Sequence, residues 1–125
     1  MQALQEKGVF IVDEDPFWKS ILSQMLSDLG FGNITCFDHE QKCLDHLYLN
    51  PALVFIDYQL VRTKGYEELA KTKAAFPHIQ IILCLASDEL KAAFQVMETG
   101  SYDYILKNHV TPYEINEILT RYINH

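Results

Sequence analysis

The chain has little of several things: 5 glycines, 4 prolines, 3 cysteines, and only 10 basic residues against 17 acidic ones in 125 residues. The formal net charge is therefore −7, which argues against direct binding of nucleic acid, because such binding needs a basic surface opposite the phosphates. No apolar run approaches the ~20 residues that span a bilayer. We find no internal repeat, no low-complexity stretch and no linker.

The three cysteines, Cys36, Cys43 and Cys84, form no CxxC or metal-ligand pattern, which indicates reduced thiols and favours a cytoplasmic location. Residues 1–7 lack the apolar core of a signal peptide. With 49% hydrophobic and 22% charged residues, the composition is that of an ordinary globular protein. The sequence predicts one domain over residues 1–125.

Short apolar runs alternate with segments of helical spacing. The runs predict strands near 9–13, 34–37, 52–57, 79–85 and 102–106, and the segments predict five helices between and after them. Asp15-Pro16 and Thr111-Pro112 are typical helix starts, whereas Gly30 and Gly100 suit helix ends. This alternation predicts an α/β fold, a doubly wound parallel sheet of five strands with five helices.

Charged side chains follow three of the predicted strands. Asp13-Glu14 ends the first apolar run, Asp57 ends the third, and Lys107 follows the fifth. In a parallel sheet these ends meet at one edge, where ligands bind. Crowded carboxylates repel one another and favour a cation between them. The pattern therefore predicts Mg²⁺-dependent phosphate chemistry on an aspartate.

With these residues, the chain resembles a two-component response-regulator receiver domain over nearly its whole length. Asp13-Glu14 matches the acid pair of that family, Asp57 the phosphate acceptor and Lys107 the lysine. Gly65, eight positions after the acceptor, and Tyr104, three before the lysine, match a loop glycine and an aromatic switch position. The resemblance implies a flavodoxin-like fold with strand order 2-1-3-4-5.

The resemblance also implies the roles of these residues. Glu14, Asp57 and the backbone carbonyl of Gln59 would bind Mg²⁺ directly, and Asp13 would act mainly through water. Lys107 would pair with Asp57 and then with the phosphoryl group. The donor would be a sensor histidine kinase or a phosphotransfer protein, and an attached output domain or downstream protein would receive the signal. On this interpretation the chain is a signalling domain and not an enzyme, with no membrane partner.

The fourth strand departs from the family pattern. Leu85 stands where the family has Thr or Ser, and leucine cannot donate the hydrogen bond that couples the phosphoryl group to this strand. We expect a weakened or rewired switch, with Ser87 capping the next helix. Asn108 replaces the usual proline after Lys107, which favours a trans bond there, and Val61 replaces a common proline in the 58–65 loop.

Other interpretations stay open. Taken alone, Asp57 would be interpreted as an ordinary turn aspartate and Lys107 as a surface lysine. Their joint placement at the ends of predicted strands favours a phosphate-binding site instead. One alternative function is a phosphate-independent pseudo-receiver, which Leu85 favours. Another is a haloacid-dehalogenase-like phosphatase with Asp13 as its nucleophile.

By family analogy, partners or a second copy would bind the fourth helix, fifth strand and fifth helix, with Lys91, Phe94, Tyr104 and Tyr113 on that surface.

Overall fold

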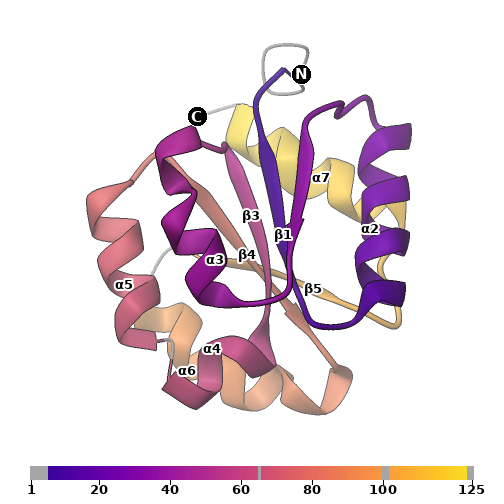
Figure 1. Cartoon of the computed structure of the whole chain (residues 1–125). Helices are drawn as coiled ribbons and strands as arrows, with labels where there is room; N and C mark the ends of the chain where they lie inside the picture. The colour runs from indigo at the N-terminus through magenta and orange to yellow at the C-terminus, as the bar shows by residue number, and fades with distance from the viewer. Residues whose placement is uncertain (1–5, 65, 100–101, 124–125) are drawn as a thin grey trace.

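A computed structural model describes residues 6–64, 66–99 and 102–123 (Figure 1). Gly65 and Gly100, which the sequence predicts as a loop glycine and a helix end, lie outside these ranges. The strands are β1 (Val9–Val12), β2 (Ile34–Phe37), β3 (Leu53–Asp57), β4 (Gln80–Leu85) and β5 (Asp103–Leu106). All five predicted strands are therefore present, with bounds within one residue or so of those expected.

The helices alternate with these strands. They are α2 (Pro16–Asp28), α3 (Glu40–Asp45), α4 (Tyr58–Lys64), α5 (Tyr66–Ala75), α6 (Leu90–Thr99) and α7 (Pro112–Ile123), with 3-10 turns η1 (Leu47–Leu49) and η2 (Ser87–Glu89). Among the described residues no helix is both long enough and apolar enough to cross a bilayer.

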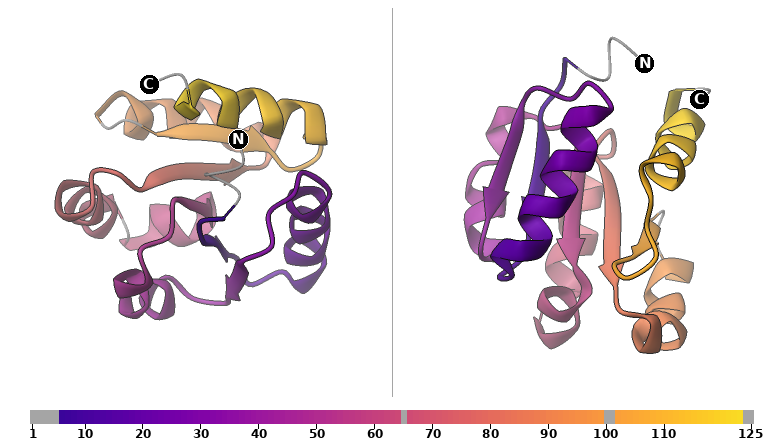
Figure 2. Two further views of the ribbon diagram at one scale, coloured as in Figure 1. Left: turned by 90° about the horizontal axis from the view of Figure 1, so that it is seen from above. Right: turned by 90° about the vertical axis from the view of Figure 1, so that its right-hand side faces the viewer.

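The strands form one parallel sheet in the order β2-β1-β3-β4-β5, as predicted. Helices α2 and α7 cover one face, and α3, α5 and α6 cover the other (Figures 1 and 2). The chain reverses its direction of strand addition between β1 and β3. In such sheets this reversal opens a crevice at the carboxyl ends of the two strands.

Side chains along each strand alternate between two cores. In β1, Val9 and Ile11 pack toward α2 and α7, whereas Phe10 and Val12 pack toward α3, α5 and α6. β3 and β4 divide in the same way. Because both faces are covered, the central strands consist almost entirely of apolar residues.

The predicted ends of α2 and α7 are confirmed by their capping bonds. The Asp15 carboxylate accepts a hydrogen bond from the Phe17 N–H at 2.9 Å, and Gly30 has a φ of 101° just beyond α2. The N–H groups of Gly30 and Phe31 return to carbonyls of the last turn of α2, which is a Schellman ending. The Thr111 hydroxyl accepts from the Glu114 N–H at 3.3 Å and caps α7.

The segment after β3, expected as a loop, instead forms α4 in addition to the five predicted helices. Tyr58 and Val61, one turn apart, are both buried in the core beneath α3, α5 and α6. This pair anchors the short helix to the sheet. Asp57, the last residue of β3, is thus followed at once by a helix and not by an open loop.

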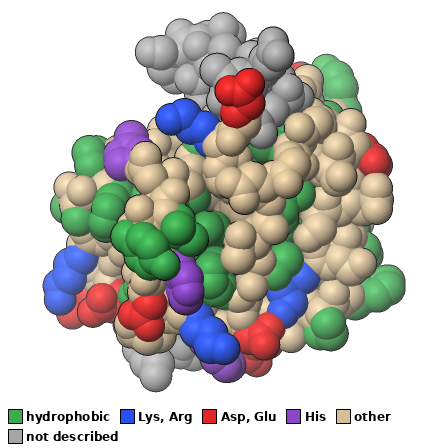
Figure 3. Space-filling view, turned by 45° about the horizontal axis from the view of Figure 1, so that its top comes forward, with side chains coloured by type: hydrophobic (Ala, Val, Ile, Leu, Met, Phe, Trp, Pro, Cys, Tyr) green, Lys and Arg blue, Asp and Glu red, His purple; other side chains and the backbone are tan. Residues whose placement is uncertain are grey.

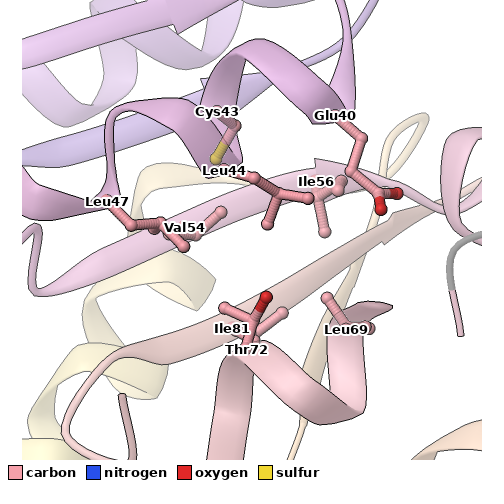
Figure 4. A pocket seen from close by; sticks show the side chains of 9 residues that line it. All are labelled: Glu40, Cys43, Leu44, Leu47, Val54, Ile56, Leu69, Thr72 and Ile81. Atoms are coloured by element: carbon pink, nitrogen blue, oxygen red, sulfur yellow. The ribbon is translucent and has the colours of Figure 1, made fainter. Parts of the chain in front are cut away.

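A small cavity lies between α3 and α5 above the sheet (Figure 4). Its volume is about 20 Å³, and apart from Glu40 and Thr72 its lining is apolar, including Cys43, Val54 and Ile81. Pockets that bind small molecules are at least ten times larger. On the surface, acidic and basic side chains are interspersed on the face seen in Figure 3. The cavity is therefore a packing defect, and the charged edge of the sheet is the better candidate site.

Candidate functional site

The carboxyl ends of β1, β3 and β5 bring Asp13, Asp57 and Lys107 together. Val12 pairs with Ile56, so the next residues of the two strands, Asp13 and Asp57, reach the same edge of the sheet. The Lys107 Nζ lies 2.6 Å from Asp13 Oδ2 and 3.2 Å from Asp57 Oδ1. The structure thus places one ammonium against two carboxylates, as the sequence predicts.

These three groups differ in burial, in hydrogen bonds and in the causes that shift their pKa values. Asp13 is 2% exposed, and its other oxygen, Oδ1, accepts a hydrogen bond from the Asp15 N–H at 2.9 Å. Burial lowers the pKa of Lys107, but its hydrogen bond to Asp13 and the charges of Asp57 and Asp13 outweigh burial and raise that pKa overall. Burial and the charge of Asp13 raise the pKa of Asp57, against the opposing effect of Lys107.

The distances to Lys107 add to the effect of burial on the pKa of Asp57. Lys107 lies closer to Asp13 than to Asp57, so its charge is largely matched by Asp13. Asp57 then faces an excess of negative charge, which disfavours its own ionised form. A site with two carboxylates and one ammonium retains net negative charge, and this excess suits a further cation.

The other predicted metal ligands lie beside this cluster. Glu14 is exposed directly after Asp13, and the Gln59 N–H points at Asp57 Oδ1 over 3.5 Å. Within the described ranges, no three His, Cys, Asp or Glu side chains converge as a preformed metal cage. Mg²⁺ needs no such cage, because it binds through one or two carboxylates and keeps several waters. The donor set, with its excess negative charge, therefore fits Mg²⁺.

Sequence reasoning missed Trp18. This residue of α2 is 5% exposed, and the Lys107 Nζ lies 5.6 Å from its ring centroid, a cation–π arrangement. It belongs to the same buried cluster as Cys84 of β4. Its position in the helix that follows the acid pair is the only sequence signal, and that signal equally fits ordinary packing.

The end of β4 differs from the charged edge. Leu85 is fully buried in the core beneath α3, α5 and α6, and its carbonyl accepts from the Lys107 backbone N–H at 2.8 Å. The expected capping role of Ser87 is wrong. The turn η2 begins at Ser87 itself, so the N-cap position falls on Ala86, which has no side-chain oxygen.

Glu89 occupies the role expected of Ser87, and sequence reasoning missed it too. Its Oε1 accepts from the Ala86 N–H at 2.8 Å, and its Oε2 accepts from the Gln59 side-chain amide at 2.6 Å. Glu89 is only 8% exposed, so these bonds keep a buried carboxylate solvated by protein groups. The contact with Gln59 joins residues 30 positions apart, which no local pattern reveals.

Tyr104, the expected switch aromatic, is half-buried on β5 and meets Phe94 of α6 edge-on, with ring centroids 6.0 Å apart. Its switching role stays a prediction. The bond between Lys107 and Asn108 is trans, because no described peptide bond is cis.

A five-stranded parallel sheet in this order, with an acidic site and one lysine at its strand-order reversal, defines a doubly wound α/β domain. The family model described as the response regulator receiver domain matches residues 9–120. The chain belongs to this family.

Two curated relatives illustrate the match. The DNA-binding transcriptional regulator NtrC of Klebsiella pneumoniae is 27% identical over 125 residues, covering 96% of this chain and 26% of NtrC. The probable transcriptional regulatory protein TcrX of Mycobacterium tuberculosis is 25% identical over 117 residues, covering 94% of this chain and 48% of TcrX. The chain therefore spans about a quarter to a half of these relatives.

Solved receiver domains have the same fold. The BeF3-activated DrrB receiver domain superposes with a TM-score of 0.75 at 23% identity, covering 96% of this chain and 99% of that one. The receiver domain of NtrX from Brucella abortus gives 0.78 at 21% identity, covering 93% and 98%.

Proposed function

We propose that the chain accepts a phosphoryl group on Asp57 in a Mg²⁺-dependent reaction and relays the signal through a change in its surface. The observation that carries this proposal is the position of Lys107, whose ammonium touches Asp57 while Asp13 holds it in place. The donor is a phosphohistidine of a sensor histidine kinase or of a phosphotransfer protein. An attached output domain or a separate protein then receives the signal.

The transfer exchanges one bond for another. A carboxylate oxygen of Asp57 forms a bond to phosphorus as the bond from phosphorus to the histidine nitrogen breaks, and the released imidazole takes up a proton. Glu14, Asp57 and the Gln59 carbonyl would hold Mg²⁺, which would supply charge that offsets repulsion between carboxylate and phosphoryl oxygens. Lys107 orients Asp57 beforehand and pairs with a phosphoryl oxygen afterwards. Positioning and charge stabilisation account for the chemistry.

The bonds of Asp13 favour this proposal over a phosphatase with Asp13 as nucleophile. One of its oxygens is bound by Lys107 and the other by the Asp15 N–H, and the side chain is buried. Asp57 is the more accessible carboxylate and therefore the better nucleophile. We accordingly expect no turnover of phosphate esters, and we place the domain in the cytoplasm, where its three free cysteines would stay reduced.

The partner surface that we propose is formed by α6, β5 and α7. Phe94 and Tyr113 are 46% and 69% exposed there. Tyr104 lies against Phe94, so a change at the site that moves this tyrosine would alter the exposed aromatic group. This surface suits a downstream protein or a second copy of the chain.

The test is intact mass after incubation with acetyl phosphate and Mg²⁺, followed by mapping of the modified residue. The wild-type chain should gain one phosphoryl group on Asp57, and Asp57→Asn should gain none. Asp45→Asn removes an exposed carboxylate on α3 and serves as the matched control. A wild-type chain that gains no phosphoryl group would favour the phosphate-independent pseudo-receiver, which the buried Leu85 also fits.

A further inference from the structure

The buried carboxylate of Glu89 joins three segments around the acceptor. Its two oxygens bind the side chain of Gln59, on the first turn of α4, and the backbone N–H of Ala86, directly after β4. Glu89 itself ends η2, and α6 begins at the next residue. A shift at any of these three points therefore disturbs the other two.

The same residues border Asp57 on two sides. The Gln59 backbone N–H faces Asp57 Oδ1, and Ala86 follows Leu85, whose carbonyl binds the Lys107 backbone. Glu89 thus binds Gln59, which lies two residues after Asp57, and Ala86, which follows the end of β4. Leu85 lies between them without a polar side-chain atom.

We propose that Glu89 is a positioning residue that holds Gln59 beside Asp57, and that release of this contact on phosphorylation carries the signal to α6. The coupling part of this inference rests on the proposed function. In this chain the Gln59–Glu89 contact thereby replaces the link that a hydroxyl at position 85 would supply.

The charge of the phosphoryl group is the physical reason for release of the Gln59–Glu89 contact. A phosphoryl group on Asp57 adds about −1.5 to −2 charges and three acceptor oxygens next to Gln59. These oxygens compete with Glu89 for the Gln59 amide, and their charge repels the Glu89 carboxylate. Once Gln59 turns away, one buried oxygen of Glu89 loses its partner. An unsatisfied buried carboxylate is unfavourable, so η2 and the first turn of α6 must rearrange.

The experiment compares Gln59→Ala, Glu89→Ala and the double variant with the wild type and with Asp88→Ala. Asp88 is the matched control, because it is an exposed acid in the same turn. Hydrogen exchange of the α6 backbone amides is measured before and after addition of beryllofluoride and Mg²⁺. Gln59→Met removes the side-chain amide but keeps the side-chain length, and it stands in should Glu89→Ala fold poorly.

In the wild type and in Asp88→Ala, beryllofluoride should accelerate exchange in the first turn of α6 by about ten-fold, the effect of one hydrogen bond to a charged group. In either alanine variant at Gln59 or Glu89, exchange should already be fast, and beryllofluoride should add little. The double variant should behave like Glu89→Ala, because Gln59 acts through its contact with Glu89, whereas Glu89→Ala also removes the bond to Ala86. A full wild-type response in Glu89→Ala, or additive effects in the double variant, would overturn the coupling role.

A second measurement separates the two proposals. In the unmodified protein the side-chain amide of Gln59 should give a shifted NMR signal because it donates to a carboxylate, and that shift should vanish in Glu89→Ala but persist in Asp88→Ala. Persistence in both variants would overturn the positioning role. If the wild type takes up no phosphoryl group, the proposed function and the coupling role both fail, and the Gln59 signal still decides the positioning role.

Discussion

The edge of the sheet has two unlike halves. At the ends of β1, β3 and β5, Asp13, Asp57 and Lys107 contact one another directly and are partly or fully buried. At the end of β4, the side chain of Leu85 is apolar and buried, and Glu89 reaches across to Gln59 of α4. On the proposed function, the first half contains the groups that would react with the phosphoryl donor, and the second contains those that would sense the phosphoryl group.

The difference shows which features of this fold are set by strands and which by loops. The charged half follows from parallel register, because residues that end neighbouring strands must meet. The second half depends on side chains in a 3-10 turn and a short helix, whose contacts vary with small changes in the loops. A receiver domain can thus keep its reactive groups and change its coupling.

Removing the lysine should give the largest effect. Lys107→Met leaves the buried Asp13 without its ammonium, and we expect the free energy of unfolding to fall by about 2–3 kcal/mol, somewhat below the loss for a fully buried pair. Urea unfolding at pH 7 measures this. Lys71→Met, which removes an exposed lysine 3.8 Å from Glu68, should change stability by less than about 0.5 kcal/mol.

The double variant Asp13→Asn with Lys107→Met sharpens the comparison. Because it removes the uncompensated charge as well, it should recover much of the lost stability. An equal loss in the single and double variants would mean that the packing of Lys107, and not its charge, holds the first half together.

Replacing Leu85 with threonine should have the next largest effect. Leu85→Thr removes buried methyl groups and places a hydroxyl in an apolar core, so unfolding should become easier by about 2 kcal/mol. The new hydroxyl should also change the lifetime of the phosphoryl group on Asp57. Leu83→Thr is the control, since Leu83 is equally buried on the same strand but lies farther from its end.

Leu83→Thr should lose similar stability while leaving the phosphoryl lifetime unchanged. If Leu85→Thr also leaves the lifetime and the α6 response unchanged, position 85 has no part in coupling, and the two halves of the site differ less than we infer.

Much of the first half could be predicted from sequence, because each charged residue ends an apolar run and the runs pair in register. The sequence also predicted Leu85 as the departure from the family. The helix α4 was missed because its apolar anchor is only the pair Tyr58 and Val61, too short a pattern to distinguish from a loop. The bond from Glu89 to Gln59 was missed because it depends on the three-dimensional fold of two loops.

Asp57→Asn should have a smaller effect, and of opposite sign. Burial and Asp13 raise the pKa of Asp57 above its ordinary value of 3.8, so the folded state binds the proton more tightly than the unfolded state does. Stability therefore falls as pH rises from about that ordinary value through the raised pKa. The asparagine variant escapes this loss and should be more stable than the wild type at pH 7.

Urea unfolding across pH 3–8 tests this expectation, with Asp45→Asn as the exposed control. The advantage of Asp57→Asn should shrink as the pH falls toward the ordinary pKa of an aspartate, and added Mg²⁺ should stabilise the wild type alone. An advantage that is independent of pH would show that shape, and not charge, is responsible.

The smallest effect concerns Trp18, the apolar wall of the charged half. Its ring lies 5.6 Å from the Lys107 Nζ, and such a contact contributes about 0.5–1 kcal/mol at a partly exposed site. Trp18→Leu should therefore slow phosphoryl transfer to Asp57 by roughly two- to five-fold, and Trp18→Phe, which keeps a ring, should slow it less.

The packing control is Leu22→Ala. Leu22 lies four residues after Trp18 in α2 and is also buried. This variant should lower stability without slowing transfer, because Leu22 belongs to the core beneath α2 and α7. Equal slowing in Leu22→Ala and Trp18→Leu would mean that α2 supports the site only through its packing. Slowing in the tryptophan variants alone would mean that the first half includes an aromatic ring as well as three charges.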